Sequence, residues 1–143
     1  MPAASRTVEI DAPIETVFDV ITDYASYPSF LDNVGTVTVA DANDAGAKVT
    51  YAVEVLGKKV HYTLAMVHHG PNKVSWSLHD SNVMKQSDGS WELVDLGGRT
   101  KATYTVDVKP RGFVPGPVVK ALTGRALPAT VDAFKKRAES RTA

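Results

Sequence analysis

The 143-residue chain contains no cysteine. This absence excludes disulfide bonds, thiolate metal ligands and a cysteine nucleophile, and it leaves the redox environment of the protein undecided. An excess of either charge is also lacking, because 16 lysine and arginine residues balance 16 aspartate and glutamate residues. Since nucleic-acid binding usually requires a broad basic surface, we expect no nucleic-acid partner.

Long apolar runs are absent as well. The first residues, Met1 to Arg6, lead directly into an alternation of polar and apolar residues, without the apolar core of a signal peptide and without a membrane span. The sequence shows no linker, repeat or low-complexity segment, and its length suits one hydrophobic core. We therefore expect a single domain over residues 1–143, located in the cytoplasm.

Several catalytic and metal-binding patterns are missing too. The four histidines, His61, His68, His69 and His79, show no HxxxH spacing and have no carboxylate pair beside them in sequence, so no metal site is expected. His61 and His79 fall on the polar side of predicted strands, and His68 and His69 stand at a predicted turn, which indicates solvated side chains. No G-x-S-x-G element and no phosphate-binding glycine loop occur, and we expect no cofactor.

What the sequence does contain is a long series of two-residue alternations between Thr36 and Lys109. Apolar residues at every second position are typical of antiparallel strands that bury one face. The pattern recurs in residues 49–55, 60–66, 74–78, 91–93 and 102–108. Turn residues separate these segments, and a further strand is predicted at about residues 5–10. The pattern thus predicts a meander of roughly seven strands that must curl or be covered on its apolar face.

Helical periodicity occurs at both ends of this series. Before it, one helical face carries Ile14, Val17, Phe18 and Ile21. Asp11 is expected to cap this short helix, with Pro13 in its first turn. After the strands, helical spacing relates Val118, Val119, Leu122, Ala126, Leu127, Val131 and Phe134. Pro128 lies within this second pattern and should bend the helix or split it into a short and a longer piece, which together cover the sheet.

Between the first helix and the strands, a Tyr-Pro pair ends the helix and returns aromatic residues toward the core. It lies in the segment Asp23-Tyr24-Ala25-Ser26-Tyr27-Pro28-Ser29-Phe30-Leu31. This segment and the Val131-Asp132-Ala133-Phe134-Lys135-Lys136-Arg137-Ala138 ending resemble the START-like (helix-grip, SRPBCC) superfamily, most closely its polyketide cyclase/dehydrase and coenzyme Q-binding branch. The resemblance covers essentially the whole chain. It implies an α+β fold in which a curved antiparallel sheet wraps around a long C-terminal helix, with two short helices after the first strand.

The resemblance also implies a cavity between sheet and helix that receives lipids, sterols, quinones or polyketides. Parity predicts that it is lined by Tyr51, Val53, Tyr62, Leu64, Trp76, Leu78, Trp91, Tyr104 and Val106 from the sheet, and by Val119, Leu122 and Ala126 from the helix. Taken alone, each side chain is better explained as core packing. Together, the tyrosine hydroxyls and indole N–H groups place a few polar points in an apolar pocket.

Three functions follow. The leading one is a non-catalytic protein that shields a small hydrophobic or amphipathic ligand, such as a lipid, sterol, quinone or polyketide-like molecule, from water. The first alternative is a polyketide aromatase, cyclase or dehydrase. For that chemistry the inward residues offer tyrosines but no carboxylate or histidine, and an unperturbed tyrosine is a poor base at neutral pH. The second alternative is an interaction module similar to the ribosome-association toxins, with Lys135, Lys136, Arg137 and Arg141 on its working surface. No catalytic residue is identified.

Entry to such a cavity requires motion. Glycine and proline surround Phe113 and Val114 in the segment from Arg111 to Pro117, and Gly124 to Pro128 lies behind it. We expect this region to act as a gate and to contact a membrane surface transiently during ligand exchange. The polar outer side of the predicted sheet argues against a large apolar interface, so we expect a monomer, or a weak dimer through an edge strand.

Overall fold

A computed structural model describes residues 4–31, 34–55, 58–81, 84–110 and 127–141. Over these ranges, strands dominate and three helical segments accompany them. The elements are β1 (Ala4–Ile10), α1 (Ile14–Thr22), the 3-10 helix η1 (Tyr24–Ser29), β2 (Val34–Asn43), β3 (Gly46–Val55), β4 (Lys58–His68), β5 (Lys73–Ser81), β6 (Met84–Asp95), β7 (Thr100–Pro110) and α3 (Leu127–Ser140). The strands form one antiparallel sheet in the order β1-β7-β6-β5-β4-β3-β2.

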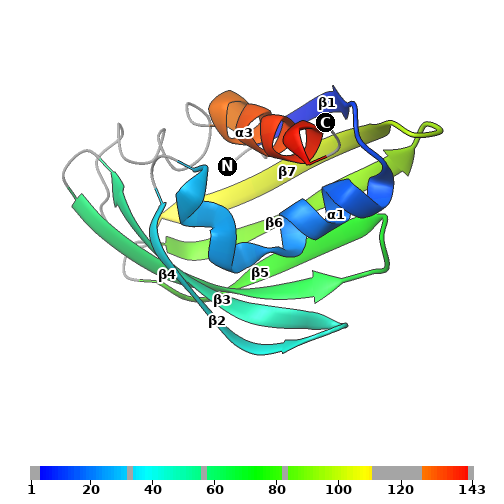
Figure 1. Cartoon of the computed structure of the whole chain (residues 1–143). Helices are drawn as coiled ribbons and strands as arrows, with labels where there is room; N and C mark the ends of the chain where they lie inside the picture. Colours follow the sequence, from blue (N-terminus) through cyan, green and yellow to red (C-terminus); the bar gives the residue numbers. More distant parts are fainter. Residues whose placement is uncertain (1–3, 32–33, 56–57, 82–83, 111–126, 142–143) are drawn as a thin grey trace.

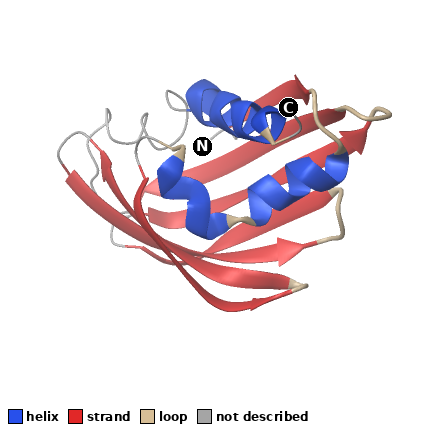
Figure 2. Cartoon of the chain, viewed as in Figure 1, coloured by secondary structure: helices blue, strands red, loops and turns tan. Residues whose placement is uncertain are grey.

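The described helices all lie on one side of the curved sheet (Figure 1). Helix α3 packs over β1, η1 packs against β2, and α1 contacts both α3 and β6. Figure 2 shows the resulting two layers, with strands forming the outer wall and helices filling its concave side. The predicted helix-grip α+β fold, with its seven strands and its short helices after the first strand, is confirmed.

Period-two alternation places the apolar residues of each strand on the side that faces the helices, which we call the inner face. Its buried strand residues include Ile10, Val49, Tyr51, Val60, Leu64, Met66, Val74, Trp76, Trp91, Leu93, Ala102, Val106 and Val108. An irregularity between Thr63 and Leu64 in the β4–β5 pairing shifts the parity of β5. As a result Ser81 is buried, and its hydroxyl donates to the carbonyl of His61 at 3.1 Å.

Helix α1 begins later than the sequence suggested. Pro13 is the residue at its N-cap, with extended backbone and no side-chain cap. The expectation that Asp11 caps the helix is wrong, because its carboxylate pairs with the guanidinium of Arg99 at 2.5 Å. The predicted buried face is otherwise present: Ile14, Val17 and Ile21 are buried, and Phe18 is half-buried.

Helix α3 begins at Leu127, so that Pro128 lies in its first turn. A proline at that position costs little, since the N–H groups of a first turn have no partner within the helix. The longer piece of the predicted split helix therefore corresponds to α3. The other piece, together with the expected gate, falls in residues 111–126, outside the described residues. Val131, Phe134 and Ala138 form the buried face of α3.

Candidate ligand-binding site

A continuous series of aromatic rings crosses the inner face and joins the sheet to η1 and α3. Adjacent ring centroids are separated by 4.9 Å for Tyr62–Tyr51, 6.1 Å for Tyr51–Tyr27, 5.2 Å for Tyr27–Phe134, 5.2 Å for Phe134–Trp91, 4.9 Å for Trp91–Tyr104 and 5.5 Å for Tyr104–Trp76. We call these residues the aromatic series. Most of the pairs are tilted or edge-to-face, which are favourable arrangements for aromatic rings. Each of β3 to β7 contributes one ring, so the series depends on the whole curved sheet.

The position of Trp76 within the series depends on a glycine on the neighbouring strand. Gly89 of β6 is the cross-strand partner of Trp76. A Cβ atom at residue 89 would overlap the indole of Trp76 and the backbone carbonyl of Thr105. The absence of a side chain therefore leaves room for the indole to lie over β6 and approach Tyr104.

The tyrosine hydroxyls fall into two groups. The hydroxyl of Tyr27 donates to the carbonyl of Ile21, and that of Tyr24 lies 2.8 Å from Nε2 of His68. Within the part of the chain that the structure describes, the hydroxyls of Tyr51, Tyr62 and Tyr104 have no hydrogen-bond partner. Because these hydroxyls have no partner among the described residues, they can serve a bound molecule.

Burial makes these phenols weaker acids than a free tyrosine. It raises the pKa of Tyr62 to about 12. Burial also raises the pKa of Tyr51 and of Tyr104 above its usual range, and neighbouring tyrosines add to the effect. A free tyrosine is already neutral near pH 7, and these three hydroxyls keep their protons to higher pH, so they can donate a hydrogen bond to a carbonyl or hydroxyl oxygen.

The structure brings most of the predicted lining residues together on the inner face. Tyr51, Leu64, Trp76, Trp91 and Val106 are buried there, and Tyr62, Leu78 and Tyr104 are partly buried against the same core. Val53 pairs with Val60 across β3 and β4, but its side chain is outside the described set. Val119, Leu122 and Ala126 also lie outside the described residues, so their lining role stays a prediction.

Sequence reasoning missed Tyr27 and Phe134 as members of the aromatic series. Both residues stood in recognised patterns, Tyr27 in the Tyr-Pro segment and Phe134 on the apolar side of the last helix. Periodicity shows that such residues are buried, but it does not show which strand they meet. Only the docking of η1 and α3 brings these two rings into contact with Trp91 and Tyr51.

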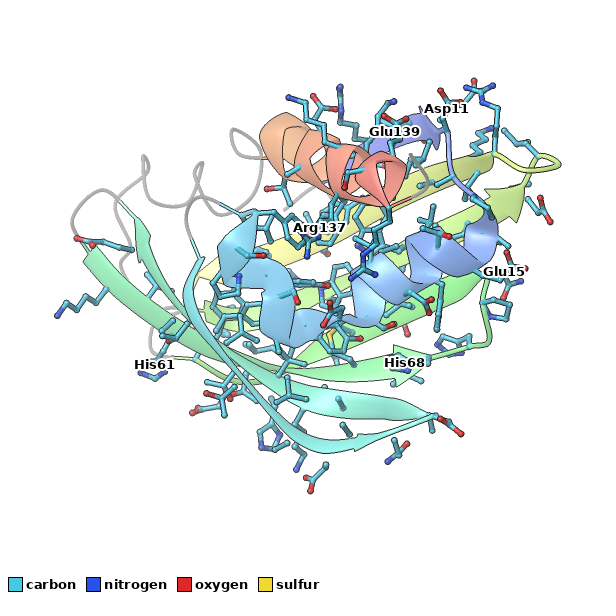
Figure 3. The ribbon with its side chains drawn as sticks, viewed as in Figure 1. Asp11, Glu15, His61, His68, Arg137 and Glu139 are labelled. Carbon is cyan, nitrogen blue, oxygen red and sulfur yellow. The ribbon has the colours of Figure 1, made fainter. Side chains whose placement is uncertain are left out.

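His68 corrects another expectation. It is not a solvated turn residue, because β4 continues through it and places its ring on the inner side at the end of the sheet near α1 (Figure 3). The imidazole lies edge-to-face with Phe18 at 5.8 Å and stacks on Tyr24 at 6.1 Å. The expectation that no histidine faces the inner side of the sheet is therefore wrong. The expectation that His61, His69 and His79 are solvated is confirmed, since all three side chains are exposed.

The basic cluster at the C-terminal end is largely engaged within the protein. Lys135 pairs with Glu139 at 2.5 Å, and Arg141 pairs with Asp23 at 3.4 Å. The guanidinium of Arg137 lies 5.4 Å from the ring centroid of Phe30, on the side of α3 that faces η1 (Figure 3). Lys136 is exposed. These contacts leave less free positive charge on this surface than the sequence suggested.

Two other kinds of feature are relevant to the described residues, a metal site and a membrane-spanning helix. No group of three or more histidine, cysteine, aspartate or glutamate residues among them is arranged to hold a metal ion. None of the helices in the described ranges is long and apolar enough to cross a membrane.

A curved antiparallel sheet, a C-terminal helix on its concave side and an aromatic inner face together define the START-like, helix-grip class of ligand-binding folds. Within that class, a family model described as polyketide cyclase / dehydrase and lipid transport matches residues 1–139. The chain belongs to this family.

Solved structures with a similar fold include proteins of different descriptions. A START superfamily protein from Mycobacterium smegmatis is 26% identical, with a TM-score of 0.83 and coverage of 96% of this chain and 97% of that one. The Zhui aromatase/cyclase from Streptomyces sp. R1128 is 19% identical, with a TM-score of 0.88 and coverage of 99% and 96%. Human STARD10 is 17% identical, with a TM-score of 0.73 and coverage of 95% and 62%. A comparison with curated proteins finds no match.

Proposed function

We propose that the protein binds a small hydrophobic or amphipathic molecule, such as a lipid, sterol, quinone or polyketide-like compound, between the inner face and α3. The observation that supports this proposal most directly is the aromatic series with three hydroxyls that have no partner within the described residues. Apolar contact would supply the affinity, at ~25 cal/mol per Å² buried, and the hydroxyls would orient the molecule. A few hundred Å² of contact is enough for roughly micromolar binding after the entropic cost of association.

Under this proposal, the ligand contacts the predicted lining residues of the sheet and the predicted residues of 119–126. The ligand is then the main partner, and we infer that the protein acts in the cytoplasm as a monomer or weak dimer, without nucleic acid. The balanced charge of the chain and the exposed polar residues on the outer side of the sheet support this view. The proposed gate and its membrane contact involve residues 111–117, outside the described set.

A cyclase or aromatase is the second candidate, and the neutral tyrosines favour it. A phenol with a raised pKa donates a hydrogen bond to a developing enolate without losing its own proton. The Zhui aromatase/cyclase shares the fold, although a similarity at 19% identity does not transfer its activity. Replacement of Tyr62 by Phe separates the two functions, because a binder should lose little affinity whereas an enzyme should lose turnover.

The first experiment is native mass spectrometry of the protein isolated from its own organism, followed by organic extraction of any bound molecule. We expect a stoichiometric lipid, quinone or polyketide-like compound. Adding the extracted compound to the apo protein should quench tryptophan fluorescence, because both tryptophans of the chain, Trp76 and Trp91, belong to the aromatic series. A clean apo mass, with no change in fluorescence on titration with apolar probes, would overturn the proposal and favour the interaction module.

A further inference from the structure

Arg6 is a cation on the otherwise largely apolar inner face. In the antiparallel pairing of β1 with β7 it lies directly opposite Tyr104, a member of the aromatic series. Cross-strand partners project to the same side of a sheet, so Arg6 shares the inner face with Tyr104. Its side chain reaches toward α3, where Nη2 lies 3.5 Å from Oδ1 of Asp132.

The guanidinium of Arg6 is poorly satisfied in the described structure. Its Nε atom is buried and has no hydrogen-bond partner. The contact with Asp132 is at the outer limit of a hydrogen bond, and the two side chains are 39% and 49% exposed. A buried N–H of a charged group without an acceptor is strongly unfavourable, so its persistence requires an explanation.

Arg141 provides a useful comparison within the same protein. Its Nη2 lies 3.4 Å from Oδ2 of Asp23, and these side chains are 38% and 37% exposed. The ion pairs of Arg6 and Arg141 are therefore nearly matched in length and exposure. The two arginines differ in their surroundings. Arg6 has a buried N–H group without a partner in the described part of the chain and lies opposite Tyr104 of the aromatic series, whereas Arg141 has neither property.

We propose that Arg6 binds an acidic group of the ligand, a carboxylate or an equivalent oxyanion, while the apolar body of the ligand lies on the aromatic series. Arginine presents Nε and one terminal nitrogen as a planar fork that matches the two oxygens of a carboxylate. A ligand carboxylate bound to this pair of nitrogens would accept a hydrogen bond from the buried Nε–H group. The half-exposed carboxylate of Asp132 can return to water when the ligand displaces it. This inference rests on the proposed binding function and adds the chemical class of the ligand.

The test compares naphthoate with acetonaphthone, two probes with the same aromatic ring system of which only the first is anionic. Isothermal titration calorimetry of the wild-type protein should show tighter binding of naphthoate. Replacement of Arg6 by Gln should weaken naphthoate binding by about tenfold or more, because a charge-assisted bidentate contact is lost. Acetonaphthone binding should change by less than about twofold, since its ring contacts remain. Arg6→Lys keeps the charge without the fork and should give an intermediate affinity.

Two further variants separate recognition from a structural ion pair. Arg141→Gln removes the matched ion pair and should leave the affinity for both probes unchanged. Asp132→Asn should leave or strengthen naphthoate binding, because it removes the competing carboxylate. Equal loss of naphthoate affinity in Arg6→Gln and Asp132→Asn would overturn the inference, as would equal loss of both probes in Arg6→Gln. Wild-type protein that binds acetonaphthone without preferring naphthoate would overturn the inference alone, whereas binding of neither probe would count against the proposed function and the inference together.

Discussion

At the scale of single residues, the geometry of the inner face depends on what is missing as much as on what is present. Gly89 has no side chain, and the space that a Cβ would need is filled by the indole of Trp76. That indole contacts Tyr104, which in turn contacts Trp91. One glycine on β6 therefore positions three rings of the aromatic series, and with them the hydroxyl of Tyr104.

Replacement of Gly89 by Ala tests this dependence. The added methyl group should displace the indole of Trp76 and lower the free energy of unfolding by roughly 1–3 kcal/mol, as overpacking does. Urea unfolding measures the loss, and tryptophan emission should shift because the environment of Trp76 changes. Gly97→Ala is the control, since Gly97 has a φ of +81° and no atom near its missing Cβ. That control should strain the backbone and leave the emission unchanged. An unshifted emission in Gly89→Ala would contradict the assigned role.

At the scale of elements, the strands could be predicted more fully than the helices. Alternation is a local property, so parity alone placed Tyr51, Trp76 and Tyr104 on the correct face. The predicted position of the turn after β4 was wrong, because the strand pairing continues through His68, whose parity matches that of the inward residues of β4. The place of Phe134 in the site could not be predicted, since it depends on how α3 docks on distant strands. Local periodicity contains no information about that docking.

Phe134 is the anchor of α3 in the aromatic series. Its ring lies 5.2 Å from each of Tyr27, Phe30 and Trp91 and is 4% exposed. Phe134→Ala should reduce the free energy of unfolding by roughly 3–5 kcal/mol, because it leaves a cavity among these rings. Phe134→Leu should reduce the free energy of unfolding by a smaller amount, because it leaves a smaller cavity. Chemical denaturation measures both changes against Lys136→Ala, an exposed position on the same helix, which should alter stability by less than about 0.5 kcal/mol. A loss in Phe134→Ala as small as that control would show that other contacts hold α3.

At the scale of the whole molecule, the aromatic inner face determines how the stability of the fold responds to alkaline pH. The chain has five tyrosines, and burial raises the pKa of every one of them. Their concentration on one side of the sheet could be predicted from strand parity for Tyr51, Tyr62 and Tyr104. Their shared titration behaviour could not, because it arises from burial that depends on how the helices pack against the sheet.

This shared burial fixes the sign of the response to alkaline pH. In the unfolded chain tyrosine loses its proton near pH 10, whereas the folded protein retains the proton of Tyr62 up to about pH 12. The folded state then binds more protons between these values, so the free energy of unfolding falls as pH rises through this window and is unaffected by tyrosine at neutral pH. Each such tyrosine contributes about 1.4 kcal/mol per pH unit to the slope. Tyr62→Phe should reduce the slope by that amount.

Ultraviolet difference spectroscopy during an alkaline titration measures the same effect directly. We expect no tyrosine absorbance change near pH 10 while circular dichroism still shows the native sheet, and a cooperative change when the protein unfolds. The urea-unfolded protein, in which all five tyrosines are solvated, supplies the reference titration near pH 10. A fraction of tyrosine that ionises near this reference value in the native state would show that at least one hydroxyl is open to water. It would then argue for a solvated inner face in place of the apolar site proposed for the ligand.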